Sequence, residues 1–149
     1  MVLLEDTRNK VGKHKNIHAY CDRHNIEIVR QCLSVGDYML PAGNVSVDTK
    51  ENLEEISRNL MNHNDSSRFW NEIRRSKELG IKLIVLVEAG PAYKSINDIA
   101  RWKSKYSGAT GRSLIEAMIR CEFSYGTIFK FCSKASTAKR IIELLEGKE

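Results

Sequence analysis

The chain has 149 residues, a length that suits one domain around one hydrophobic core. Hydrophobic residues make up 42% and charged residues 29%, which excludes a disordered chain, and no apolar run is long enough to span a membrane. The net charge of +5 favours partners that carry phosphate without requiring them. The N-terminus lacks a signal-peptide pattern, and none of the four cysteines forms a Cys-x-x-Cys pair, so we expect an intracellular protein with reduced thiols.

Hydrophobic periodicity predicts strands and helices along the whole chain. In chain order, the expected elements are a strand at residues 2–5, a helix at 15–24, strands at 26–33, 36–40 and 45–49, helices at 51–63 and 68–79, a strand at 81–87, helices at 95–103 and 113–123, a strand at 126–132 and a helix at 137–145. A break at Asn64 to Ser67 separates the second and third helices, and Gly80 ends the third. This order predicts an α/β sandwich with a mixed central sheet.

Two aspartates and a lysine near the predicted hairpin form the candidate catalytic group. Asp37 follows Gly36 before the turn, and Asp48-Thr49-Lys50 lies on the return strand. A hairpin brings the two aspartates close together, and strand alternation points Asp48 and Lys50 to the same face. Glu54 lies one turn into the next helix, where it could face the same point. Carboxylates suit Mg²⁺ or Mn²⁺ and a neighbouring lysine can orient a water, so the pattern favours phosphodiester hydrolysis.

Several segments, taken in order, resemble one known family. They are Asp6-Thr7-Arg8, residues 33–38, residues 47–54, Arg68-Phe69, residues 84–88 and residues 124–145. The sequence is similar to the XPF/Hef nuclease domain family, a branch of the restriction-endonuclease-like (PD-(D/E)XK) superfamily. That family has Gly-Asp, a spacer, Glu-Arg-Lys, three residues and then Asp. The resemblance covers nearly the whole chain and implies a restriction-endonuclease-like three-layer sandwich, with helices on both sides of a mixed sheet.

The resemblance also implies roles for the acidic residues and the lysine. Asp37 and Asp48 would bind the divalent metal, Mg²⁺ or Mn²⁺, and Lys50 would position the attacking water. Glu54 replaces the last Asp of the family pattern and would complete the acidic cluster. Asp6 would add a further metal-binding carboxylate at the end of the first strand.

The resemblance implies that Arg8 and Arg68 contact DNA phosphates, and Lys103 and Lys105 are two further candidates for DNA contacts. The two lysines belong to a glycine-containing segment, residues 101–112, that interleaves cations with aromatic side chains. Such a segment could clamp a nucleic-acid strand through phosphate contacts and stacking, or it could be a surface loop whose Trp102 docks into the core. The resemblance further implies a homodimer formed through the C-terminal elements. The aromatic residues there, which belong to the core or to that interface, are Phe123, Tyr125, Phe129 and Phe131.

The sequence departs from the family pattern at three points. Thr49 stands in place of the middle arginine of the tripeptide, and Asn9 stands where many relatives carry Glu. No paired helix-hairpin-helix segment follows residue 149. We therefore expect a single nuclease domain over residues 1–149, without a helix-hairpin-helix or helicase domain.

The expected function is a metal-dependent DNA endonuclease, with flap, fork or junction DNA in repair or recombination as candidate substrates. Thr49 and Asn9 motivate an alternative, a catalytically silent DNA-binding or scaffold subunit. A hydrolase that acts on RNA or nucleotides is a weaker third interpretation.

Three local alternatives also stay open at the level of sequence. Asp6 could end a strand and pair with Arg8, and Glu54 could pair with Arg58 on an exposed helix face. His14, His18 and Cys21 share a helical face and suggest zinc, although structural zinc sites usually draw ligands from two elements.

Overall fold

A six-stranded mixed sheet forms the centre of the computed structural model, which describes residues 1–61 and 63–148. The strands are β1 (Val2–Asp6), β2 (Glu27–Gln31), β3 (Tyr38–Met39), β4 (Val45–Lys50), β5 (Lys82–Glu88) and β6 (Ile128–Cys132). Their order across the sheet is β2-β1-β3-β4-β5-β6. Within the described residues β3 is the one strand antiparallel to its neighbours, and the other pairs are parallel.

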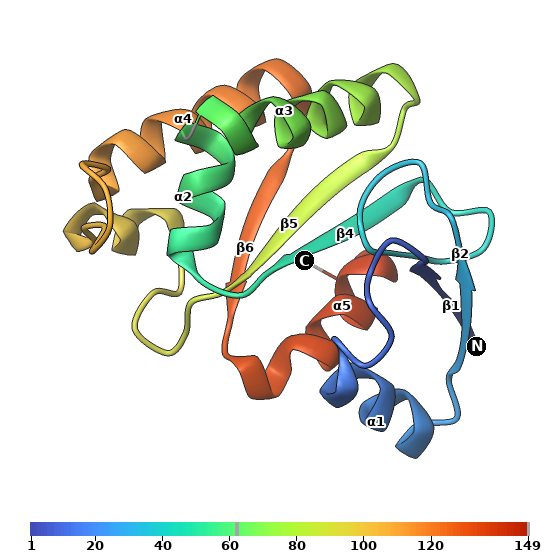
Figure 1. Ribbon diagram of the computed structural model, residues 1–149. Coiled ribbons are helices and arrows are strands. Elements are labelled where there is room, and N and C mark those ends of the chain that lie inside the picture. The colour runs from blue at the N-terminus through green and yellow to red at the C-terminus, as the bar shows by residue number, and fades with distance from the viewer. Residues whose placement is uncertain (62, 149) are drawn as a thin grey trace.

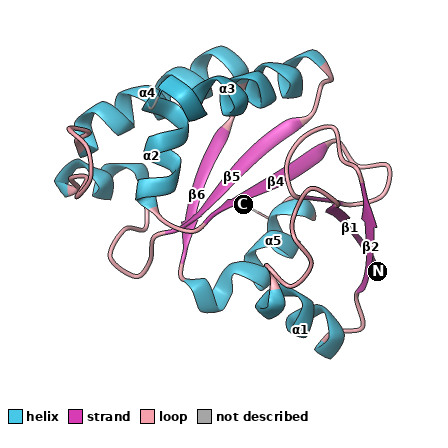
Figure 2. Cartoon of the chain, viewed as in Figure 1, coloured by secondary structure: helices cyan, strands magenta, loops and turns pink. Residues whose placement is uncertain are grey.

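Helices cover both faces of the sheet (Figure 1 and Figure 2). The helices α1 (Lys15–Arg23) and α5 (Thr137–Leu145) pack on one face. The other face carries α2 (Leu53–Met61), α3 (His63–Glu78) and α4 (Gly111–Tyr125). Two short 3₁₀ helices, η1 (Ile96–Arg101) and η2 (Lys134–Ser136), precede α4 and α5. The predicted three-layer α/β sandwich is confirmed.

Strand β5 lies between two hydrophobic cores because its side chains alternate between the faces of the sheet. Ile84 and Leu86 belong to the core under α1 and α5, together with Val47. Val85 and Val87 belong to the core under α2, α3 and α4. The predicted burial of this strand on both faces is therefore confirmed. No helix among the described residues is long and apolar enough to cross a bilayer.

The predicted separation of the second and third helices is confirmed, but its predicted position is wrong, because α2 ends at Met61. Helix α3 begins at His63, so Asn64 to Ser67 lie within its first two turns. Asn, Asp and Ser are unfavourable in a helix interior but favourable near its N-terminus. They are therefore compatible with a helix that begins at His63 rather than at Arg68. Packing of Phe69 and Ile73 in the core then stabilises the long helix.

The parallel strands bring their C-terminal ends to one edge of the sheet. Strands β1, β4 and β5 end there at Asp6, Lys50 and Glu88. Strand β3 runs the opposite way, so Asp37, which precedes it, lies at the same edge. Residues from four separate segments of sequence therefore converge at one place.

Candidate active site

Gly36 allows the chain to turn so that Asp37 enters β3 beside β4. Its φ is +74°, and a Cβ atom at this position would lie 2.0 Å from the Ser46 hydroxyl oxygen. The Asp37 amide donates to the Val47 carbonyl at 2.9 Å, and Tyr38 pairs with Val47 in the ladder. Asp37 is thus opposite Asp48, which confirms that the hairpin brings the two aspartates to neighbouring strands.

Asp48 and Lys50 form a buried ion pair on the side of the sheet that faces α2 and α3. The Lys50 Nζ atom lies 3.1 Å from Asp48 Oδ2 and 4.5 Å from the centre of the Phe69 ring. Burial and the charge of Asp37 raise the pKa of Asp48 well above its usual range, and Lys50 offsets only part of that rise. Burial lowers the pKa of Lys50, but Asp48 and Glu55 outweigh it and raise the pKa overall. Lys50 is therefore a cation at neutral pH.

Asp37 is held by the two residues at which the sequence departs from the family pattern. Thr49 donates its amide (2.9 Å) and its hydroxyl (2.8 Å) to Asp37 Oδ2. Asn9 donates its side-chain amide to Asp37 Oδ1 at 3.1 Å. The residues that replace the expected Arg and Glu thus orient one of the predicted metal ligands.

Asp6 shows the strand-end pairing that the sequence left open as an alternative. Its Oδ2 atom accepts from Arg8 Nε at 2.6 Å, and its Oδ1 atom accepts from the Leu33 amide at 2.9 Å. Arg8 also donates to the Leu33 carbonyl at 2.8 Å. Asp6 is therefore connected to the segment after β2 directly through Oδ1 and indirectly through Arg8.

The Glu54 carboxylate has two partners that the sequence analysis did not predict. Its Oε2 atom accepts from the Ser104 hydroxyl and its Oε1 atom from the Lys105 amide, each at 2.8 Å. The predicted place of Glu54 in an acidic cluster with Asp48 stays a prediction. Its carboxylate joins α2 to the loop that precedes α4.

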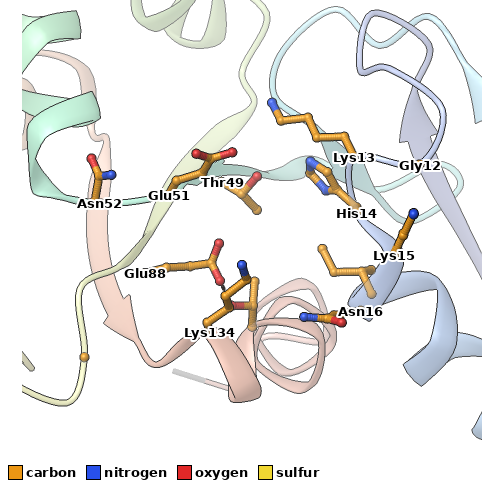
Figure 3. Close-up of a pocket in the computed structure, with 13 residues that line it drawn as sticks. Gly12, Lys13, His14, Lys15, Asn16, Thr49, Glu51, Asn52, Glu88 and Lys134 are labelled. Atoms are coloured by element: carbon orange, nitrogen blue, oxygen red, sulfur yellow. Dashed lines mark hydrogen bonds between the residues drawn. The ribbon is translucent and has the colours of Figure 1, made fainter.

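A cavity of about 570 Å³ opens at the same sheet edge, on the side of α1 and α5 (Figure 3). Thr49 and Glu51 enter it from the end of β4, and Glu88 enters it from the end of β5. Its cationic lining residues are Lys13, Lys15 and Lys134. Thr49 contacts Asp37, so the cavity adjoins the carboxylate group and could admit a phosphate-bearing ligand.

Comparison with known proteins shows the family and the fold of the chain. Residues 6–145 match the ERCC4 domain family. The chain belongs to the ERCC4 domain family. Its fold is similar to that of XPF from Aeropyrum pernix, with a TM-score of 0.71, 19% identity, and coverage of 98% of this chain and 64% of that one. XPF from Aeropyrum pernix in complex with DNA gives a TM-score of 0.70 and 19% identity, with coverage of 97% and 63%.

The ERCC4 domain thus corresponds to less than two thirds of the length of those two solved chains. No curated protein matches the sequence. The predicted membership of the XPF/Hef nuclease domain family is confirmed.

The ERCC4 domain contains an acidic site residue that the sequence analysis missed. Glu72 on α3 accepts from the Gly36 amide at 2.6 Å, and its charge adds to burial and Asp37 in raising the pKa of Asp48. Glu72 lies one helical turn after Phe69, whose ring contacts Lys50. That spacing places both residues on one helix face and was the available signal.

The oxygen atoms of Asp37 and Asp48 suit a Mg²⁺ or Mn²⁺ ion. Asp48 Oδ2 is buried and has no aligned hydrogen bond in the described part of the chain. Magnesium commonly uses one or two protein carboxylates and completes its shell with water and substrate phosphate. Within residues 1–61 and 63–148, no three Asp, Glu, His or Cys residues are arranged to hold a metal ion, so the predicted set of Asp6, Asp37 and Asp48 is not assembled.

His14, which precedes α1, and His18, on α1, have partners other than a metal. His14 Nδ1 lies 2.6 Å from the Tyr38 hydroxyl, and His18 Nε2 lies 2.8 Å from Glu5 Oε2. Burial lowers the pKa of His14 and raises that of Cys21 to about 11. These contacts favour a structural network over the zinc alternative.

The predicted DNA-binding residues lie at the surface to different degrees. Arg68, Lys103 and Lys105 are exposed. The Arg8 side chain is 53% exposed even though it is paired with Asp6. The backbone of Lys103 pairs with Thr110, so this lysine belongs to an ordered loop.

Proposed function

We propose that this ERCC4 domain is a divalent-metal-dependent DNA endonuclease that hydrolyses phosphodiester bonds. The observation that carries the proposal is the group at the end of β4. Asp48 lies on β4 and Asp37 lies opposite it, immediately before β3, and the Lys50 ammonium is 3.1 Å from Asp48. The similar fold of an XPF protein that was solved with DNA supports DNA as the substrate class.

In this proposal, the chain supplies a preorganised ligand pair and a fixed cation. Asp37 and Asp48 would hold Mg²⁺ or Mn²⁺, which when bound polarises the phosphate and lowers the pKa of a water. Thr49 and Asn9 hold the Asp37 carboxylate in one orientation. Lys50 can donate to the attacking water and stabilise the negative charge that develops on the phosphate.

The exposed cations give the same site a means of binding DNA. Arg8, Arg68, Lys103 and Lys105 would contact backbone phosphates, whose recognition does not depend on sequence. We also propose a homodimer formed through α4, because Phe123 is 92% exposed and Ile119, one turn earlier, is 51% exposed.

The test is cleavage of labelled duplex, single-stranded, flap and forked DNA in Mg²⁺, Mn²⁺ or EDTA. We expect metal-dependent cutting that Asp48→Asn lowers by roughly 100-fold or more. Asp22→Asn, the same change at an exposed position on α1, should cut like the wild type. Wild-type activity in Asp48→Asn would overturn the assignment of Asp48. DNA binding without cutting by the wild type would favour the silent scaffold, and the ranking of substrates would identify the preferred DNA structure.

A further inference from the structure

The loop of residues 103–110, between η1 and α4, presents an aromatic side chain to solvent. Tyr106 is 85% exposed, and the cationic residues Lys103, Lys105 and Arg112 beside it in the sequence are exposed as well. We propose that Tyr106 is a binding site for an unpaired nucleobase, and that Glu54 is the positioning residue that holds this Tyr106 loop. The identity of the ligand rests on the proposed function.

Glu54 fastens the Tyr106 loop to α2 with both carboxylate oxygens. One oxygen accepts from the Ser104 hydroxyl and the other from the Lys105 amide, both at 2.8 Å. Two hydrogen bonds to one carboxylate fix the direction as well as the distance of the attached segment. The attachment places the loop at the N-terminal end of α2, which begins three residues after Lys50 (Figure 1).

Ser104 makes the Tyr106 loop an ordered turn. Its buried hydroxyl oxygen accepts from the Tyr106 and Ser107 amides, each at 3.1 Å, while it donates to Glu54. The Ser104 amide donates to the Ala109 carbonyl at 3.0 Å, and Lys103 pairs with Thr110. A preformed loop loses little conformational entropy when it binds, so an aromatic side chain at its tip is a favourable contact.

The end of the Tyr106 loop is equally constrained. The Gly111 amide donates to the Trp102 carbonyl at 2.7 Å, and a Cβ atom at Gly111 would lie 1.8 Å from the Ile99 carbonyl oxygen. Trp102 itself packs against the core under α2, α3 and α4. The sequence left open whether this segment docks or binds, and the structure shows that Trp102 docks while Tyr106 remains exposed.

An unpaired nucleobase fits this chemistry better than a base pair does. An exposed ring stacks on the face of any base, and neighbouring cations contact the phosphates of the same strand. The faces of bases within a duplex are already covered by their neighbours, so a duplex would meet the cations alone. We therefore expect Tyr106 to contribute to binding of a single strand and much less to binding of a duplex.

The experiment measures binding of labelled oligo(dT) and of a blunt DNA duplex by fluorescence anisotropy in EDTA. Tyr106→Ala should weaken oligo(dT) binding by roughly 5- to 150-fold, the range expected for loss of one stacked base. Tyr106→Phe keeps the ring and should bind like the wild type. Unchanged oligo(dT) binding by Tyr106→Ala, or equal weakening by Tyr106→Phe, would overturn the stacking site.

A double-mutant cycle tests the role of Glu54. Glu54→Ala should weaken oligo(dT) binding when Tyr106 is present and have little further effect in Tyr106→Ala, whereas Glu54→Gln, which keeps one acceptor oxygen, should partly restore binding. Additive effects would overturn the positioning role. Mn²⁺ titration should give wild-type affinity for Glu54→Ala, because this carboxylate contacts the loop and not Asp48.

The two proposals can fail separately in these measurements. A wild type that binds oligo(dT) through Tyr106 but cuts no DNA with metal would overturn the endonuclease and leave the nucleobase site standing. A wild type that cuts DNA while Tyr106→Ala binds oligo(dT) normally would overturn the nucleobase site alone.

Discussion

Thr49 donates both its backbone amide and its hydroxyl to one carboxylate oxygen of Asp37, at 2.9 and 2.8 Å. This residue replaces an arginine in the pattern to which the sequence is similar, yet it contacts a predicted metal ligand directly. The replacement therefore gives the site an orienting group, which counts against the view that the motif has merely lost its function.

Replacing Thr49 by valine removes the hydroxyl and keeps the β-branched shape. We expect cleavage to fall by about 10- to 100-fold, the usual effect of losing a hydrogen bond to a metal ligand. Thr49→Ser, which retains the hydroxyl, should stay close to the wild type. Single-turnover cleavage in Mg²⁺ measures both variants, and equal activity of Thr49→Val and Thr49→Ser would contradict the orienting role.

The substitution Lys50→Met tests the role of the lysine separately from the role of the metal ligands. The methionine can still pack on Phe69, but it cannot donate to a water or a phosphate, so cleavage should fall by about 100-fold or more. Mn²⁺ binding should be retained or strengthened, because Asp48 loses its competing ion-pair partner. Titration calorimetry and cleavage check the two effects, with the exposed Lys139→Met as the control. Loss of Mn²⁺ binding in Lys50→Met would contradict this division of roles.

The sequence predicted the framework of the site because its signals are local. The alternation in residues 45–49 defines β4, and the helix expected at 137–145 is α5 in the structure. Gly36 marks a turn that only a residue without a side chain fits. Short-range patterns of this kind determined where Asp37, Asp48 and Lys50 would lie.

The directions in which the acidic side chains of α2 and α3 point could not be predicted in the same way. The amide of Glu55 donates to Asn52 Oδ1 at 2.8 Å, and Glu55 Oε1 accepts from the Glu51 amide at 2.7 Å. This capping arrangement starts the helix at Leu53. Packing of Leu53 and Ile56 in the core then leaves Glu54 facing the Tyr106 loop. Glu72 reaches the site only because α3 packs on the sheet; its spacing from Phe69 indicates a shared helix face but not what that face packs against.

Gly36→Ala should damage both stability and activity. Alanine is strained at the φ of +74° found here, and its Cβ atom would lie 2.0 Å from the Ser46 hydroxyl oxygen. The chain must therefore move at this point, and Asp37 must shift with it. We expect a loss of roughly 2–3 kcal/mol in the free energy of unfolding, together with loss of cleavage. Gly80→Ala is a matched control, because φ is +68° but no atom lies within 4 Å. Gly80→Ala should lose about 1 kcal/mol in the free energy of unfolding and keep full activity. Urea denaturation measures both variants, and equal losses of stability would contradict the prediction.

The buried Glu5 carboxylate should make stability depend on pH in the acidic range. Burial raises the pKa of Glu5, but hydrogen bonds from Tyr38 and His18 and the charge of Arg30 outweigh burial and lower the pKa overall. Because the folded pKa is below the unfolded one, this contribution is complete above about pH 4.3 and is lost as the pH falls through the folded value.

Glu5→Gln should cost about 3–5 kcal/mol at pH 7 and flatten the acid dependence, since it leaves Arg30 without its buried partner. Urea denaturation from pH 3 to 7 measures both effects, with the exposed Glu27→Gln on β2 as the control. An unchanged pH profile in Glu5→Gln would show that other groups govern acid unfolding.

Phe123→Glu should convert the proposed homodimer to a monomer. Phe123 and Ile119 are 92% and 51% exposed on one face of α4, and burying a large apolar side chain contributes about 1.5–3 kcal/mol. A two-fold axis would bury each of these side chains twice, so one new charge per copy disrupts the interface twice. Sedimentation velocity over a range of concentrations should show a dimer for the wild type and for Val11→Glu, a matched change at a position that is 85% exposed. A wild type that stays monomeric, or a Phe123→Glu variant that stays dimeric, would exclude this face of α4 as the interface.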